Sequence, residues 1–83
     1  MRYKIAFKKS VSKDLKKLGK DTAHRILDKI ELDLPEKADT FPLLTGKFSG
    51  LRKFRIEDYL VIYTIIENTA LVLRITHRRD AYR

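Results

Sequence analysis

The sequence has no cysteine and no tryptophan, and only three glycines and two prolines in 83 residues. The lack of cysteine excludes a disulfide framework and thiolate chemistry. The two histidines, His24 and His77, are far apart in the chain, which argues against a zinc site, and we expect no cofactor. No apolar run approaches membrane-spanning length, and the first residues lack the apolar region of a signal peptide. We therefore expect a cytoplasmic protein with no membrane partner.

Acidic residues are also few, with 11 Asp and Glu against 19 Lys and Arg, so the formal net charge is +8. Such basicity concerns the partners of a protein rather than its fold. Nucleic acid is the leading partner class, and an acidic protein is the second. The hydrophobic fraction of 43% is ordinary, so residues 1–83 should form a single domain with a packed core.

Two helices joined by a short link are predicted in the first half of the chain. Ser10 is the expected N-cap of the first helix, and Gly19 is expected just past its end. Asp21 is the expected N-cap of the second helix. Pro35 should end that helix, because the residue before a proline avoids helical conformations. A link this short favours an antiparallel helical hairpin.

Strands are predicted on both sides of this hairpin. Residues 2–8 alternate apolar and cationic side chains, which is the period of a half-buried strand. After an ordered loop at 35–50, three strands are expected near 51–57, 59–66 and 70–77. The order βααβββ predicts an α+β domain, with the helical hairpin on one face of a mainly antiparallel four-stranded sheet. The aromatic residues expected in the core are Tyr3, Phe7, Phe41, Phe48 and Phe54.

Cationic and apolar residues alternate along the strand expected at 51–57. Lys53 and Arg55 should project from one face of the sheet, and Phe54 from the other. Like charges that share a sheet face destabilise it, so this face suits a polyanion. The alternative is a solvated strand surface without a partner.

The last two strands can add cations to this face. A three-residue turn at 67–69 would place residue 62 opposite Arg74, on the side away from the helices. Arg78 would then join Arg74 there, whereas a two-residue turn would reverse the assignment. Tyr82 lies among the final arginines, an arrangement that suits stacking on a nucleotide base.

Taken together, the segments 3–18, 48–63 and 77–82 resemble the RelE/ParE toxin superfamily of type II toxin–antitoxin modules. The resemblance implies a RelE-like fold and an acidic, RelB-like antitoxin as partner, through which alone the toxin would form oligomers. For the RelE branch it further implies a ribosome-dependent endoribonuclease that cuts messenger RNA without a metal ion.

This resemblance also implies roles for particular residues. Lys53 and Arg55 match the basic positions that activate the 2′-hydroxyl and hold the phosphate. Arg78 matches the arginine that stabilises the transition state, and Tyr82 the tyrosine that stacks on the substrate. Attack by a 2′-hydroxyl builds negative charge on phosphoryl oxygens, which fixed cations stabilise. The auxiliary candidates are Arg74 and Arg79, and the residues expected to contact RNA or the ribosome are Lys13, Lys16, Lys17, Lys47 and Arg52.

Two departures from the superfamily pattern bear on the function. Leu60 stands where a further arginine is common, and Glu57 stands where glycine is common. If the site needs another cation, Leu60→Arg should raise the cleavage rate, unless Arg74 already supplies that charge. Two alternatives therefore stay open. One is a ParE-like toxin that inhibits a topoisomerase by protein contact, and the other is a weakened module that binds only RNA or antitoxin.

Overall fold

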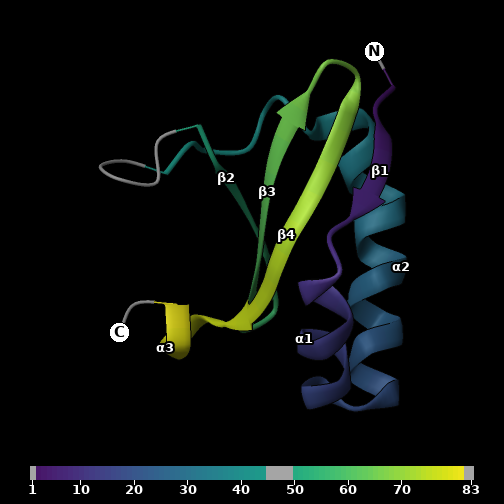
Figure 1. Cartoon of the computed structure of the whole chain (residues 1–83), viewed down its shortest axis with the longest axis vertical. Coiled ribbons are helices and arrows are strands. Elements are labelled where there is room, and N and C mark those ends of the chain that lie inside the picture. The colour runs from purple at the N-terminus through teal and green to yellow at the C-terminus, as the bar shows by residue number, and fades with distance from the viewer. Residues whose placement is uncertain (1, 45–49, 82–83) are drawn as a thin grey trace.

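The computed structural model describes residues 2–44 and 50–81, which form two long helices, a four-stranded sheet and a short final helix. The elements are β1 (Lys4–Phe7), α1 (Ser10–Leu18), α2 (Lys20–Lys37), β2 (Arg52–Ile56), β3 (Tyr59–Ile66), β4 (Thr69–His77) and α3 (Arg78–Ala81). Helices α1 and α2 lie on one side of the sheet, and α3 lies on the other (Figure 1). The predicted α+β class and the order βααβββ are confirmed, and α3 is an additional element.

The strand order in the sheet is β1-β4-β3-β2. β2 and β4 both pair antiparallel with β3, whereas β1 pairs parallel with β4, from Lys4 opposite Thr69 to Phe7 opposite Val72. The sheet is thus mainly antiparallel, as predicted. β1 is so short that β4 continues past it, and α1 packs along the remainder of β4.

The turn between β3 and β4 differs from the prediction. Ile66 pairs with Thr69, so the turn has two residues rather than three, and Glu67 adopts a positive φ of 57°. A register shift then follows, because Ile62 is opposite Arg74 while Tyr63 is opposite Val72. The extra residue in β4 compensates for the shorter turn. The predicted pairing of residue 62 with Arg74 is therefore found, although the reason given for it was wrong.

The core lies between the sheet and the two long helices. Tyr63 is completely buried there, and its hydroxyl donates a hydrogen bond of 2.6 Å to the carbonyl oxygen of Ala38, just after α2. Phe41 stacks on Phe54 with ring centroids 4.4 Å apart, as expected of core aromatics. Phe7 is 42% exposed because it ends an edge strand, so its predicted burial is wrong. The other apolar side chains that are buried in the core include Val11, Ile26, Ile30, Leu34, Val61 and Ile75.

Three of the predicted helix ends are wrong. Ser10 is the first residue of α1, and its hydroxyl donates to the carbonyl of Leu73 at 2.9 Å instead of capping the helix. Asp21 lies inside the first turn of α2, which has no side-chain cap. α2 continues through Pro35, whose carbonyl accepts a 2.7 Å hydrogen bond from the Tyr3 backbone. The Pro35 carbonyl thus has a partner in the residue that precedes β1, and the proline does not end the helix.

Tyr63 should make stability fall at alkaline pH. Burial raises the pKa of Tyr63 from 10.0 to about 12, although the nearby Arg52 charge opposes the shift. The neutral phenol therefore stabilises the fold fully below pH 10, and this contribution is lost as the pH rises toward 12. Urea unfolding of the wild type and Tyr63→Phe should show the steeper fall in the wild type. At neutral pH the variant should be less stable by about 1–3 kcal/mol, because the Ala38 carbonyl loses its donor. Parallel pH profiles would contradict this assignment.

Candidate functional site

Lys53 and Arg55 project from β2 on the side of the sheet away from α1 and α2. The strand alternates as the sequence predicts, because Phe54 and Ile56 are buried in the core while Arg55 is exposed and Lys53 half-buried. Lys53 lies opposite Ile62 and Arg55 opposite Leu60 on β3. We call the sheet face that carries these two cations the outer face.

The turn after β2 positions Arg55 and removes a carboxylate from its surroundings. The Nε of Arg55 donates to the backbone carbonyl of Glu57 at 3.0 Å. The carboxylate of Glu57 forms hydrogen bonds of 3.2 and 3.4 Å with Arg25 on α2. The negative charge at this departure from the superfamily pattern is thus paired with a helix cation rather than with Lys53 or Arg55.

Arg52 has a different place from the one expected for an RNA contact. It shares the parity of Phe54, and its Nη1 donates to the carbonyl oxygens of Phe41 at 2.7 Å and Asp39 at 3.3 Å. These bonds join the segment that follows α2 to the sheet. The alternation that puts Lys53 and Phe54 on opposite faces also puts Arg52 on the face of Phe54, toward the core. This placement could have been predicted from the sequence.

Arg74 lies opposite Ile62, and its guanidinium pairs with Asp14 on α1. The Nε and Nη2 atoms donate to the two carboxylate oxygens at 3.0 and 3.4 Å. Asp14 is only 7% exposed and also accepts a 3.0 Å hydrogen bond from the backbone N–H of Ile75. The charge of Arg74 is therefore compensated by a neighbour, which weakens its case as a substitute for a missing site cation.

Sequence reasoning did not single out Asp14, although a signal was present. Asp14 follows Val11 by three residues and precedes Leu18 by four, so it lies on the apolar face of α1. A carboxylate on that face needs a buried partner, because an unpaired charge is costly to bury. The partner could not be identified from the sequence, since Arg74 and Ile75 are about sixty residues away.

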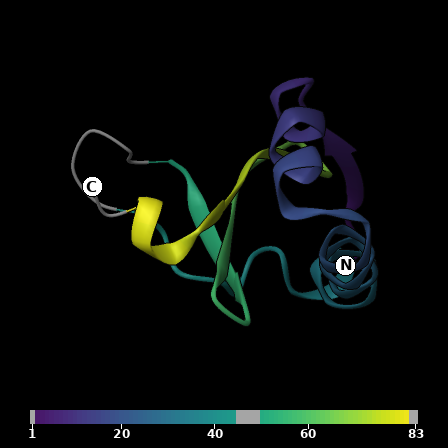
Figure 2. The ribbon, with the colours of Figure 1, turned by 90° about the horizontal axis from the view of Figure 1, so that it is seen from below.

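The C-terminal cations belong to α3, which lies on the outer side of the sheet (Figure 2). The backbone N–H of Arg78 donates to the carbonyl of Asp58 at 2.7 Å, and that of Arg79 donates to Nδ1 of His77 at 3.3 Å. Both arginine side chains are exposed. α3 follows β4 directly and contacts β3 as well as β4. Arg55 and α3 therefore lie at the same end of the sheet, where β2 ends and β3 begins.

Two of the residues predicted for the site, Tyr82 and Lys47, lie outside the described residues. The cations expected on the first helix, Lys13, Lys16 and Lys17, are exposed on α1, which packs along β4, two strands away from the β2 strand of Lys53 and Arg55. Lys17 lines a cavity of about 630 Å³ between α1, the end of β4 and α3, together with Arg74 and Arg79. Lys17 is thus the one α1 lysine that this cavity brings near the auxiliary cations.

Leu60 occupies a buried position. It is 4% exposed although it lies on the outer face, in the cross-strand row between Arg55 and Thr76. The expected gain from Leu60→Arg assumed an open position for another cation, and the structure does not meet that assumption. An arginine here would have to displace whatever covers the leucine.

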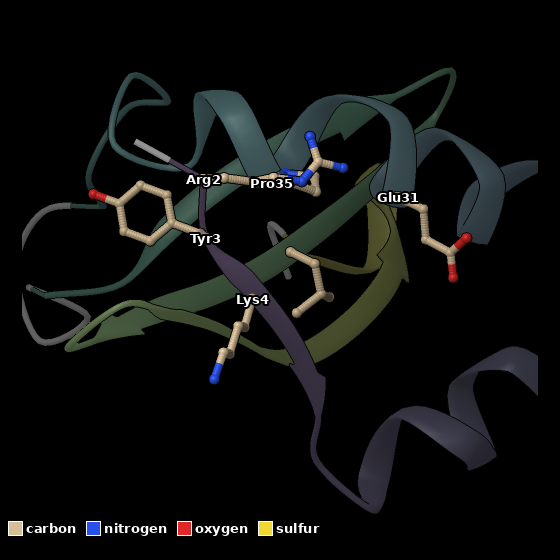
Figure 3. A pocket seen from close by; sticks show the side chains of 6 residues that line it. Arg2, Tyr3, Lys4, Glu31 and Pro35 are labelled. Atoms are coloured by element: carbon tan, nitrogen blue, oxygen red, sulfur yellow. The ribbon is translucent and has the colours of Figure 1, made fainter.

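A second cavity, between β1 and α2, does not bring charged groups together. Arg2, Tyr3, Lys4, Glu31 and Pro35 are among its lining residues (Figure 3). The side chains of Lys4 and Glu31 point away from each other, and Arg2 forms an ion pair of 3.3 Å with Glu36.

Across residues 2–44 and 50–81, no group of three or more His, Asp and Glu side chains could hold a metal ion. Within the same two ranges, no helix has both the length and the apolar character to cross a membrane.

The sequence matches a family described as ParE toxin of type II toxin-antitoxin system, parDE, over residues 5–82. The chain therefore belongs to this family of type II toxins, within the superfamily that its sequence resembles. A search of curated proteins gives no match.

Solved structures of toxins from three organisms share the fold. A chain of the RelBE2 toxin–antitoxin complex from Mycobacterium tuberculosis has a TM-score of 0.85 at 23% identity, covering 94% of this chain and 100% of that chain. The archaeal RelE–RelB complex from Pyrococcus horikoshii gives a TM-score of 0.63 at 27% identity, with coverages of 94% and 97%. The chromosomal ParDE system of P. aeruginosa gives 0.71 at 14% identity, with coverages of 92% and 96%. These similarities confirm the RelE-like α+β fold.

Proposed function

We propose that this toxin inhibits translation in the cytoplasm by cutting messenger RNA on the ribosome. The observation that carries the proposal is the outer face, where Lys53 and Arg55 project together at the end of the sheet that also bears α3 and Arg78. Cations held on a rigid sheet suit a phosphate whose charge grows in the transition state. A merely solvated surface would not require α3 to fold against the same end of the sheet.

In the proposed reaction the 2′-oxygen of a nucleotide attacks the adjacent phosphorus and the bond to the 5′-oxygen breaks. The products are a 2′,3′-cyclic phosphate and a free 5′-hydroxyl, and no metal ion takes part. Lys53 is assigned to activating the 2′-hydroxyl and Arg55 to holding the phosphate. Arg78 stabilises the added charge, and Tyr82 is assigned to stacking on a base.

An acidic antitoxin segment is the proposed protein partner. Besides its cations, the outer face carries apolar side chains, among them the half-buried Ile62 and Leu71 and the 55% exposed Ile66. An amphipathic acidic segment that folds on contact would cover both kinds of surface. Its carboxylates would compensate Lys53 and Arg55, and any oligomer would form through it.

The decisive experiment adds the purified protein to a translating extract and maps messenger RNA ends by primer extension. We expect new ends at fixed codon positions, bearing 5′-hydroxyl groups, only when ribosomes are translating. The product of an adjacent acidic reading frame should suppress the cuts. Uncut messenger RNA, with the protein folded and present in excess, would reject the proposal.

One observation favours the ParE-like alternative. Leu60 replaces a common arginine, and Arg74 is paired with Asp14, so two cations that could serve RNA cleavage are absent or compensated. A DNA supercoiling assay with gyrase is therefore the second arm of the experiment. Loss of supercoiling activity together with intact messenger RNA would establish inhibition by protein contact.

A further inference from the structure

The outer-face residues of β3 are less exposed at the end near α3 than at the far end. Ile66, at the far end, is 55% exposed, and Thr64 and Ile62 are half-buried. Leu60 is 4% exposed, although the residues opposite it, Arg55 and Thr76, are exposed and half-buried. Something on the outer side therefore covers Leu60 more completely than the rest of the row.

α3 is the element in position to do this. In the part of the chain that the structure describes, it is the one helix or strand on the outer side of the sheet (Figures 1 and 2). It contacts both β3 and β4, and Arg78 at its start is hydrogen-bonded to Asp58, two residues before Leu60.

A helix of four residues cannot be stable by itself, because helix formation requires a costly first turn. α3 therefore depends on tertiary contacts. One of them is the backbone hydrogen bond from the N–H of Arg78 to the carbonyl of Asp58. The N–H of Arg79 donates only locally, to the side-chain Nδ1 of His77 at 3.3 Å. The contacts of α3 with β3 and β4 supply further support, and Leu60 is the buried apolar side chain of β3 at this place.

We infer that α3 packs on the apolar side chain of Leu60. Leu60 is thereby a positioning residue for Arg78, the cation that α3 contributes to the proposed site. The leucine supplies packing at the place where the superfamily commonly has an arginine. This chain would then hold α3 on the sheet by hydrophobic contact, and α3 in turn fixes the direction of Arg78 relative to Arg55. The second part of this inference rests on the proposed RNA cleavage, whereas the first part does not.

The first test is amide hydrogen exchange on the free protein. Leu60→Ala should speed exchange of the hydrogen-bonded amides of Arg78 and Arg79 by about tenfold or more, while the Val61 amide stays protected, since a local opening does not expose the core. Trypsin should also cut faster after Arg78 and Arg79. The matched control is Ile62→Ala, on the same face and strand, which should leave the α3 amides unchanged within about twofold.

Two further variants keep the test valid if Leu60→Ala does not fold. Leu60→Val removes one methylene and should give a smaller acceleration in the same amides. Leu60→Met conserves volume and should restore protection. The inference is overturned if the α3 amides exchange at the wild-type rate in the truncated variants, or if they respond equally to Ile62→Ala.

The functional part is tested separately in the translating extract. With α3 released, Leu60→Ala should lower the cleavage rate at saturating ribosomes about tenfold or more, while ribosome binding changes less than about twofold, because only the direction of Arg78 is lost. Leu60→Met should restore the rate. Unchanged cleavage with a released α3 would show that Leu60 holds α3 on the sheet but does not position Arg78 for the reaction. If the wild type does not cleave messenger RNA, the proposed function is rejected. The hydrogen-exchange result alone then decides whether α3 packs on Leu60.

Discussion

Replacement of Lys53, Arg55 or Arg78 by alanine should each relieve growth inhibition and lower messenger RNA cleavage by about 100-fold or more, as expected for a group that stabilises transition-state charge. The free energy of unfolding should change by less than about 1 kcal/mol, because these cations lie outside the core. Cleavage is measured by primer extension in a translating extract, and stability by urea unfolding of the same preparations.

The control for these variants is Lys16→Ala. Lys16 is also an exposed cation, but it lies on α1, which packs along β4, two strands away from β2. This change should weaken ribosome association slightly and flatten its salt dependence, because one phosphate contact at most is lost. If Lys16→Ala abolishes toxicity while the three outer-face replacements have no effect, the helical surface carries the function instead.

The largest effect on stability is expected from Asp14→Ala, which should lower the free energy of unfolding by about 2–3 kcal/mol. The Ile75 backbone N–H would be left buried without its acceptor, and Arg74 would lose both of its hydrogen bonds to α1. For a domain of this size such a loss corresponds to a decrease in Tm of roughly 10–20 °C. Thermal unfolding followed by circular dichroism measures it directly.

Asp14→Asn separates the two interactions of Asp14. The amide oxygen can still accept from Ile75, so most of the stability should be retained, while the ion pair with Arg74 is lost. Arg74 is more than half exposed, and such pairs contribute little, about 1 kcal/mol or less. If both variants were equally unstable, the ion pair rather than the backbone acceptor would be the important contact.

Local patterns predicted most of the fold because apolar residues recur regularly, at the helical period in α1 and α2 and at every second residue in β1 and β2. Alternation on β2 predicted that Lys53 and Arg55 project from one face of the sheet and Phe54 from the other. β3 was found at its predicted limits. The errors came from contacts between distant segments. Pro35 lies inside α2 and its carbonyl accepts a hydrogen bond from the backbone of the distant Tyr3, and Phe7 is exposed because it ends an edge strand.

The candidate site was less predictable than the fold. The cations of β2 follow from strand parity alone, but the environment of Arg74 depends on Asp14, which is close only after folding. The burial of Leu60 depends on α3, a helix too short to have a periodic signal. The roles of Lys53, Arg55, Arg78 and Tyr82 stay predictions that rest on the resemblance and on chemistry.

The parallel pairing of β1 with β4 has a consequence for the order in which the chain folds. Residues 4–7 meet residues 69–72, so the first strand to be synthesised must wait for the last. α1 also waits, since its Ser10 and Asp14 bond to Leu73 and Ile75. Closing so long a loop is entropically slow, and such contacts form late in folding. Residues 69–75 must therefore be synthesised before β1 and α1 can take their final places, and an antitoxin present beforehand can meet the toxin as it forms.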